Sequence, residues 1–234
     1  MTLRHIIWRL REEFYPEKHP YDVLTGCDTS GMIHHRRLGA EATDYQPVDP
    51  DVFRATMAHV IEQIPRTNDH INQHGNGRAK EDVAAFTFVD LGCGKGRALL
   101  LAEEYDFKKI VGVDFAGNLA RIAVRNAAKV GSSRISVVHG DVREFDFPAG
   151  PLVVFLYNPF SARITRSVMQ RLISHPDTVY IAYVNPLHAD AISSLPGAEI
   201  VAKDDWCTIW RFGAGSQMDR AESGAIQIAN GALR

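Results

Sequence analysis

Apolar runs and amphipathic segments alternate regularly along the chain from about residue 83. Five short runs rich in β-branched and aromatic residues read AFTFVDL, KKIVGVD, ISVVHGD, LVVFLYNP and TVYIAYV, and segments with helical spacing lie between most of them. Continuous apolar strands that alternate with helices are typical of a parallel sheet covered on both faces. Two closing runs, AEIVAKD and CTIWRF, meet at Asp204–Trp206 without room for a helix, which predicts an antiparallel hairpin at one end of the sheet. The pattern therefore predicts an α/β fold with a doubly wound, mostly parallel sheet.

The first 80 residues have a different pattern. The segment MTLRHIIWRLREEFYP has apolar residues at helical spacing, which predicts an amphipathic helix packed on its own domain. A membrane-surface helix and a transit peptide are the alternatives, and Glu12 and Glu13 argue against the latter. Turn material follows at Tyr21–Gly31, and a second helix is predicted at about Asp51–Ile64, ended by Pro65.

Changes in composition divide the chain into three predicted parts. The polar, Gly- and Asn-rich stretch Asn68–Lys80 is typical of a linker or surface loop. We therefore expect a helical N-terminal extension or lid over residues 1–80, a core over residues 81–213, and a flexible tail of small and polar residues over 214–234.

Composition excludes several classes of function. The chain has 234 residues, 45% of them hydrophobic and 23% charged, and its net charge of −2 gives no reason to expect a nucleic-acid partner. Three widely spaced cysteines without a C-x-x-C pair predict a reducing compartment and no disulfides. The ten histidines are scattered, so no metal site is predicted. No apolar run approaches the roughly 20 residues of a membrane span, and we expect a cytoplasmic protein without a membrane partner.

The stretch FVDLGCGKGRALL places three glycines in five positions between a predicted strand and a predicted helix. Gly92 allows a sharp turn, Gly94 lets backbone N–H groups approach a ligand, and Gly96 lets the helix start close to the strand. The third glycine comes one place too early for a dinucleotide fingerprint. Asp90 would repel a pyrophosphate and instead suits a ligand with positive charge, such as an amino group or a sulfonium centre.

Two further acids follow predicted strands. Asp114 ends VGVD, where a carboxylate binds the hydroxyls of a ribose, and Asp141 follows the next strand, where a carboxylate accepts from an exocyclic amine such as that of adenine. A single acid at such a place is as often a helix cap or a solvated turn residue. Three acids in register after a Gly-rich loop favour a nucleoside site at the carboxyl edge of the sheet.

The motifs D-L-G-C-G-K-G, V-G-V-D, G-D-V and L-Y-N-P-F, within residues 83–212, resemble the class I S-adenosylmethionine-dependent methyltransferases. The resemblance implies a Rossmann-like seven-stranded sheet whose last strand is antiparallel, and S-adenosyl-L-methionine as cofactor. By this resemblance the glycine loop holds the methionine end of the cofactor, and Lys95 within it is either exposed or meets the cofactor carboxylate. The cofactor-binding residues implied are Asp90, Gly92, Cys93, Gly94, Gly96, Asp114, Phe115, Asp141, Val142 and Asn158.

The residues at the end of the fourth predicted strand should face the methyl acceptor. L-Y-N-P-F is similar to the Asn/Asp-Pro-Pro-Tyr/Phe motif of methyltransferases that modify amino or amide nitrogens, but one proline is missing, which leaves the place of Phe160 open. Asn158 and Tyr157 are the predicted catalytic residues, because an amide oxygen can accept N–H protons and an aromatic ring can stabilise a cation. Pro159 and Phe160 are predicted to contact the substrate. The alternative is that Asn158-Pro159 only turns the chain and caps the next helix.

The N-terminal part is expected to supply a lid. The segment GCDTSGMIHHRRLG, with YQP after it, is similar to a bacterial group of methyltransferases of unassigned substrate. Thr29, Ser30 and Tyr45 are candidates to close over the cofactor or substrate, and His34, with the neighbouring 35–37, to bind an acidic substrate or act as a base. A solvated polar loop is the alternative for each of them.

The predicted function is methyl transfer from S-adenosylmethionine to a nitrogen of a protein side chain or a small metabolite. An O-methyltransferase of a small molecule, a nicotinamide-dependent oxidoreductase and a non-catalytic cofactor-binding module are the alternatives. The partner is a methyl acceptor, with a nucleic acid not favoured, and the oligomeric state is left open.

Overall fold

The computed structural model describes residues 18–34, 44–64 and 83–213. The predicted N-terminal amphipathic helix, the linker at 68–80, the tail at 214–234 and residues 35–37 lie outside the described residues.

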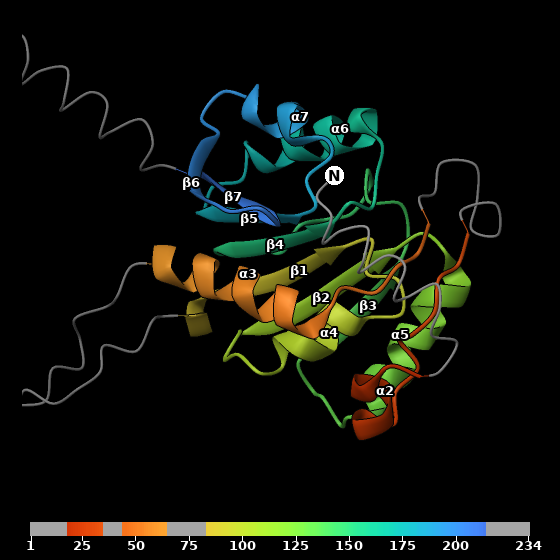
Figure 1. The fold of residues 1–234 in the computed structure, drawn as a ribbon. Helices are drawn as coiled ribbons and strands as arrows, with labels where there is room; N and C mark the ends of the chain where they lie inside the picture. Colours follow the sequence, from red (N-terminus) through yellow and green to blue (C-terminus); the bar gives the residue numbers. More distant parts are fainter. Residues whose placement is uncertain (1–17, 35–43, 65–82, 214–234) are drawn as a thin grey trace, which may run out of the picture.

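A seven-stranded sheet forms the centre of the molecule (Figure 1). The strands are β1 Thr87–Leu91, β2 Lys109–Asp114, β3 Ile135–His139, β4 Leu152–Tyr157, β5 Val179–Val184, β6 Glu199–Lys203 and β7 Cys207–Phe212. Their order across the sheet is β3-β2-β1-β4-β5-β7-β6, and β7 runs antiparallel to both of its neighbours while the other pairs are parallel. The predicted α/β fold, with a mostly parallel sheet closed by an antiparallel hairpin, is confirmed.

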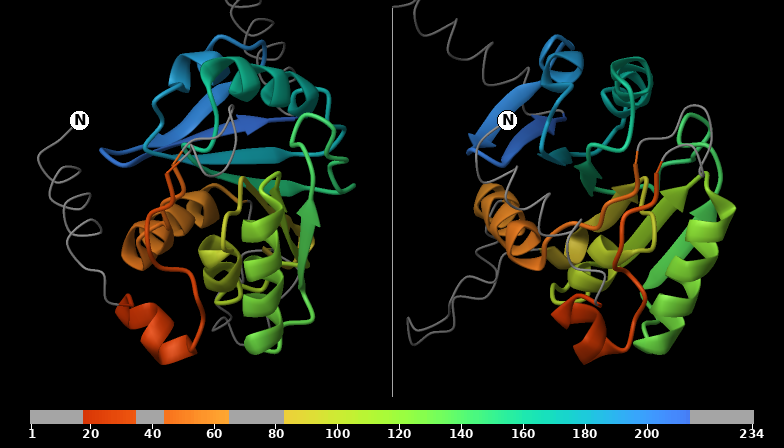
Figure 2. Two further views of the ribbon diagram at one scale, coloured as in Figure 1. Left: turned by 90° about the vertical axis from the view of Figure 1, so that its right-hand side faces the viewer. Right: turned by 45° about the vertical axis from the view of Figure 1, so that its right-hand side comes forward.

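Helices cover both faces of this sheet (Figure 2). They are α2 Pro20–Thr25, α3 Pro50–Gln63, α4 Arg97–Ala102, α5 Gly117–Lys129, α6 Ala162–Leu172 and α7 Ala189–Ser193, with a short 3-10 turn at Val83–Ala85. Because successive side chains of a strand point to opposite faces, Phe88 of β1 packs into the core under α3 and α4, whereas Val89 packs into the core under α6 and α7. The topology reverses between β1, whose chain continues to β2, and β4 on its other side, which is where open α/β sheets bind ligands.

Helix α3 is part of the layer that covers the sheet. It begins after Asp49, whose side chain accepts hydrogen bonds from the amides of residues 51 and 52, and it ends close to the predicted position. The ring of Phe53 lies with its centroid 5.9 Å from that of Phe88 and 5.2 Å from that of Phe155. Within the described residues, the end of the predicted extension therefore contributes to the main core.

Part of the predicted turn at 21–31 is instead the short helix α2. Pro20 is its first residue, the ring of His19 accepts a hydrogen bond from the amide of Tyr21, and Gly26 ends it with φ of 68°. Proline at the start and glycine after the end are typical helix boundaries, so the sequence carried this signal.

Candidate functional site

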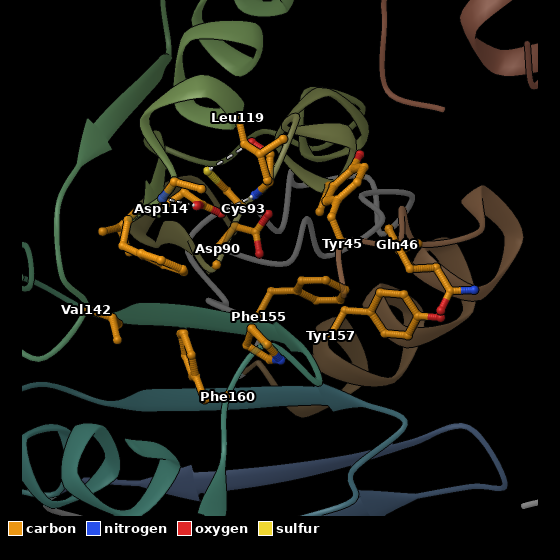
Figure 3. Close-up of a pocket in the computed structure, with 18 of the residues that line it drawn as sticks. Tyr45, Gln46, Asp90, Cys93, Asp114, Leu119, Val142, Phe155, Tyr157 and Phe160 are labelled. Carbon is orange, nitrogen blue, oxygen red and sulfur yellow. Dashed lines mark hydrogen bonds between the residues drawn. The ribbon is translucent and has the colours of Figure 1, made fainter. Parts of the chain in front are cut away.

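A cavity opens at the carboxyl ends of β1, β2 and β4 (Figure 3). It encloses about 1010 Å³ including its open mouth, and a short N-terminal segment, residues 44–48, closes one side. The sequence-predicted residues that line it are Tyr45, Asp90, Gly92, Cys93, Gly94, Asp114, Phe115, Asp141, Val142, Tyr157, Pro159 and Phe160.

The three glycines of the loop all have positive φ, at 79°, 54° and 86°. A Cβ atom on Gly92 would lie 2.6 Å from Cβ of Pro159, and one on Gly94 would lie 2.2 Å from the ring of Tyr45. Gly96 is the N-cap of α4 and lies against helix α5, where a Cβ would meet Ala123 at 3.1 Å. Gly92 therefore makes the predicted sharp turn, and the close approach allowed by the first two glycines is to neighbouring side chains that form the cavity wall.

The carboxyl group of Asp90 forms part of the cavity wall and is 4% exposed. Burial, and then the neighbouring Asp114, raise its pKa well above the ordinary range. Ionisation of this group is costly in the free protein, and a positively charged ligand group beside it would offset that cost. The predicted role of Asp90 in binding such a group stays a prediction.

Asp114 lies at the end of β2 and accepts hydrogen bonds from the backbone N–H groups of Gly94 at 2.7 Å and Ala116 at 2.8 Å. Burial raises its pKa, and these two amides lower it in part. The Gly94 amide, expected to face a ligand, is thus used to hold this carboxylate. Phe115 follows it and is 44% exposed at the cavity.

Asp141 lies at the end of β3, with its carboxylate bound by the guanidinium of Arg143 at 2.5 to 3.0 Å. This ion pair is the main reason why the pKa of Asp141 is lowered. Val142 is buried beside it and lines the cavity. The three acids therefore share one edge of the sheet, in the order that the sequence predicts.

Residues 88–175 match a family described as a methyltransferase domain. The match begins in β1 and ends just after α6, so it contains the glycine loop and the three acids. The chain therefore contains a methyltransferase domain.

A curated relative of this methyltransferase domain is the ribosomal protein L11 methyltransferase of Photobacterium profundum, which is 25% identical over 144 residues. The alignment covers 55% of this chain and 46% of the relative, so the chain spans about half the length of the curated relative that it matches.

Two solved structures are also similar to the chain. The RNA methyltransferase from Salinibacter ruber in complex with S-adenosyl-L-homocysteine has 18% identity and a TM-score of 0.47, over 71% of this chain and 92% of that chain. TrmN from Thermus thermophilus has 13% identity and a TM-score of 0.48, over 70% of this chain and 48% of that chain.

The cofactor of the methyltransferase class fits the residues present. S-adenosylmethionine carries a positively charged amino group and sulfonium, and Asp90 is a desolvated carboxyl group in the cavity wall for which no hydrogen bond is found in the described part of the chain. Asp114, Asp141 and Val142 line the same cavity, and their predicted contacts with the ribose and the adenine stay predictions.

Cys93 is a wall residue of the methyltransferase cavity and does not have the properties of a nucleophile. Burial, with Asp90 and Asp114 nearby, raises the pKa of its thiol well above the ordinary range. The thiol therefore stays protonated, and its contribution to the cavity is a small uncharged surface.

At the end of β4, the rings of Tyr157 and Phe160 line the cavity, as does Pro159 between them. Asn158 has φ of 47°, and its Oδ1 accepts a hydrogen bond from the hydroxyl of Tyr183 at 3.1 Å. Its side chain is not among the groups that line the described cavity. A catalytic or cofactor-binding role of Asn158 stays a prediction.

Of the predicted lid residues that the structure describes, only Tyr45 lies at the methyltransferase cavity. Thr29 is 0% exposed, and its hydroxyl donates to Asp22 and accepts from Arg97. His34 has a 63% exposed side chain whose Nδ1 lies 3.1 Å from Oδ1 of Asp44. This geometry gives Thr29 a structural contact and places His34 outside the cavity lining.

Sequence reasoning missed several residues of the site. Gln46 and Phe155 line the cavity, and so does Arg97, a buried residue that begins α4. A charged residue just before the fully apolar run ALLLA was the one available signal for Arg97.

One of the two interpretations of Lys95, that its side chain is exposed, is wrong. Lys95 is 8% exposed, because its Nζ donates to Oδ1 of Asp28 at 2.9 Å and to the carbonyl of Ser30 at 2.7 Å. The lysine therefore links the loop to the N-terminal segment.

Away from the cavity, His59, Asp204 and Cys207 bring one nitrogen, one oxygen and one sulfur within 4.8 Å of one another. Asp204 accepts hydrogen bonds from His59 at 3.1 Å and from the amides of residues 206 and 207, so hydrogen bonding accounts for the cluster.

None of the helices in the described ranges has both the length and the apolar character that a membrane span requires.

Proposed function

We propose that the protein transfers a methyl group to a nitrogen atom, on a protein side chain or on a small metabolite. S-adenosylmethionine supplies the methyl group from a positively charged sulfur, and the acceptor must present a lone pair in line with the bond that breaks. The nitrogen gains the methyl group, the sulfonium becomes an uncharged thioether, and the acceptor loses a proton to solvent.

The observation that carries this proposal is the aromatic wall at the acceptor end of the cavity. In Figure 3, Val142 and Asp114 lie at one end of the cavity, Asp90 lies between, and Phe155, Tyr157 and Gln46 lie toward the other end. Aromatic faces stabilise the positive charge that develops on a nitrogen during methylation.

The residues of this wall also favour nitrogen over oxygen. A neutral amine carries a reactive lone pair, whereas a hydroxyl acceptor needs a base to remove its proton. No histidine is among the cavity-lining residues within the described ranges 18–34, 44–64 and 83–213. The carboxyl group of Asp141 is held by Arg143, and that of Asp114 by two backbone amides.

In this proposal Tyr157 acts as a ring beside the acceptor nitrogen, and the turn at Asn158 fixes the ring in place. A non-glycine residue with positive φ costs about 1 kcal/mol or more, and such strain is often found at functional sites. The hydrogen bond from Tyr183 offsets part of that cost and restrains the amide of Asn158.

A protein acceptor is supported by the curated relative, which is named for methylating a ribosomal protein. The net charge of −2 supports a protein or metabolite over a nucleic acid.

Transfer of tritiated methyl into a lysate of the producing cells, followed by separation into protein, small-molecule and nucleic-acid fractions, tests this function. We expect label in the protein or small-molecule fraction that survives mild base, since N-methyl groups are stable there and methyl esters release methanol. Label in nucleic acid, or label released as methanol, would contradict a nitrogen acceptor of the proposed kind.

A binding measurement separates methyl transfer from the other enzyme class. Calorimetry should give binding of S-adenosylhomocysteine and none of NAD, and the reverse would favour an oxidoreductase. Cofactor binding without transfer into any fraction would favour a non-catalytic module.

A further inference from the structure

A buried polar network joins residues 22–30 to the glycine loop, and methyl transfer makes no direct use of it. Asp22 is 1% exposed, and its carboxylate accepts hydrogen bonds at 2.7 Å from the backbone N–H groups of Thr29 and Ser30. The hydroxyl groups of the same two residues also donate to it. Because a buried carboxylate is costly unless it is fully bonded, these contacts hold residues 29 and 30 in one conformation.

Arg97 connects this network to the loop. It follows Gly96 directly, and its Nε donates to Oγ1 of Thr29 at 2.7 Å, while one Nη donates to Oγ of Ser30 at 3.2 Å. The same guanidinium lies 3.9 Å from the carboxylate of Asp22. The two buried charges therefore face each other across Thr29 and Ser30.

The network ends at Tyr45, which lies in the cavity wall. Its hydroxyl donates to the carbonyl of Thr29 at 2.7 Å, and its ring occupies the space that a side chain on Gly94 would take. Nζ of Lys95 lies 5.8 Å from the ring centroid and also binds the carbonyl of Ser30. The ring is thus restrained at both its hydroxyl end and its face.

We propose that Asp22 is a positioning residue for the cofactor, although it does not touch the cavity. Asp22 holds Thr29, and Thr29 holds the ring of Tyr45 over the part of the cavity beside Gly94 that takes the methionine end of S-adenosylmethionine. A free ring at this place would leave that end open to water. This inference concerns cofactor affinity and does not depend on the identity of the methyl acceptor.

Calorimetry on the full chain tests the proposal with two probes, S-adenosylhomocysteine and 5′-methylthioadenosine, which lacks the amino acid end. Asp22→Asn should weaken S-adenosylhomocysteine binding about tenfold and change 5′-methylthioadenosine binding less than twofold. Tyr45→Phe, which removes the hydroxyl, should give the same pattern. The double variant should be no weaker than the stronger single variant, because both changes break one chain of contacts.

Asp204→Asn is the matched control. Asp204 also accepts hydrogen bonds from backbone amides in a turn, but it lies outside the cavity lining. It should lower the thermal midpoint and leave both affinities unchanged. Thr29→Val keeps the carbonyl and removes the hydroxyl that bridges Asp22 and Arg97, so it serves if Asp22→Asn does not fold. The proposal is overturned by equal weakening of both probes, by unchanged affinity, or by effects that multiply in the double variant.

Discussion

The carboxyl ends of β1 and β4 are neighbours at the same edge of the sheet, yet they are built differently. In the turn after β1, Gly92 and Gly94 lack side chains and so make room for Pro159 and Tyr45, and the end of β1 carries the buried acid Asp90. The segment at the end of β4 has an asparagine with positive φ, Asn158, and aromatic rings that line the cavity.

The comparison indicates that the two strand ends serve different ligands. On the β1 side, the glycine turn has a single backbone conformation and Asp90 a fixed position, which suits a cofactor that is the same in every reaction. The β4 side supplies apolar faces, which accept groups of several shapes. The two sides meet where Gly92 contacts Pro159.

The largest effect is expected from breaking that contact. In Gly92→Ala the new Cβ would lie 2.6 Å from Pro159, and φ is 79°, so clash and strain add. We expect a loss of about 3 kcal/mol in the free energy of unfolding, measured with urea. Gly131→Ala is the control, because φ is 69° and nothing lies within 4 Å, and it should cost only about 1 kcal/mol. Equal losses would mean that the two turns are not in tight contact.

Asp90→Asn should separate cofactor affinity from stability. Binding of S-adenosylhomocysteine should weaken about hundredfold, because a hydrogen-bonded charge pair is lost. The thermal midpoint of the free protein should rise, since the buried carboxylate is desolvated and lies near Asp114. Exposed Asp190→Asn is the control for the chemical change and should alter neither quantity. A lower midpoint for Asp90→Asn would show that the carboxylate has a stabilising partner.

The same residue predicts a pH dependence. Because burial raises the pKa of Asp90 in the free protein, the group takes up a proton at a higher pH than an ordinary aspartate. The protonated group cannot attract the amino group of the cofactor, so affinity should fall up to tenfold for each pH unit below this pKa. The free energy of unfolding of the free protein should instead increase as pH falls, since ionisation of Asp90 at higher pH favours the unfolded state. Calorimetry of Asp90→Asn across the same range should give a flat curve; a parallel decline would assign the titration to another group.

At the β4 side, Asn158→Ala should lower the rate of methyl transfer about tenfold without a change in S-adenosylhomocysteine affinity. The control is Asn185→Ala, because Asn185 also precedes a proline at the end of a neighbouring strand, with φ of 51°. Both variants should change stability by similar amounts. If both also slow transfer equally, the asparagine serves only the turn.

The smallest effect is expected for Tyr183→Phe, which removes the hydroxyl bonded to Asn158. The rate of transfer should fall about threefold, because the amide loses one restraint. Burial raises the pKa of Tyr183 to about 12, so the hydroxyl remains a donor throughout the assay range. Tyr180→Phe on the same strand loses a hydrogen bond to the carbonyl of Gln63 and should not affect the rate. A similar decline in both would indicate a general loss of sheet stability.

The sequence by itself determined the sheet, its closing hairpin and the acids at the strand ends, because each depends on a local pattern. Strand runs, glycines with positive φ and acids directly after strands are all read within a few residues. The motif around Asp90 is also local, and its resemblance to a known family predicted the cofactor.

The tertiary structure decided which polar residues share a site. Thr29, predicted at the cofactor, binds Asp22 and Arg97, and Lys95 is buried against the N-terminal segment. The bonds from Arg97 to Thr29 and from Lys95 to Asp28 join residues 68 and 67 positions apart, and the energy of a buried charge depends on partners that no local pattern names. The sequence predicted Tyr45 near the site. Its contact with Gly94, where the missing side chain makes room for the tyrosine ring, is also a long-range contact and was visible only in the folded chain.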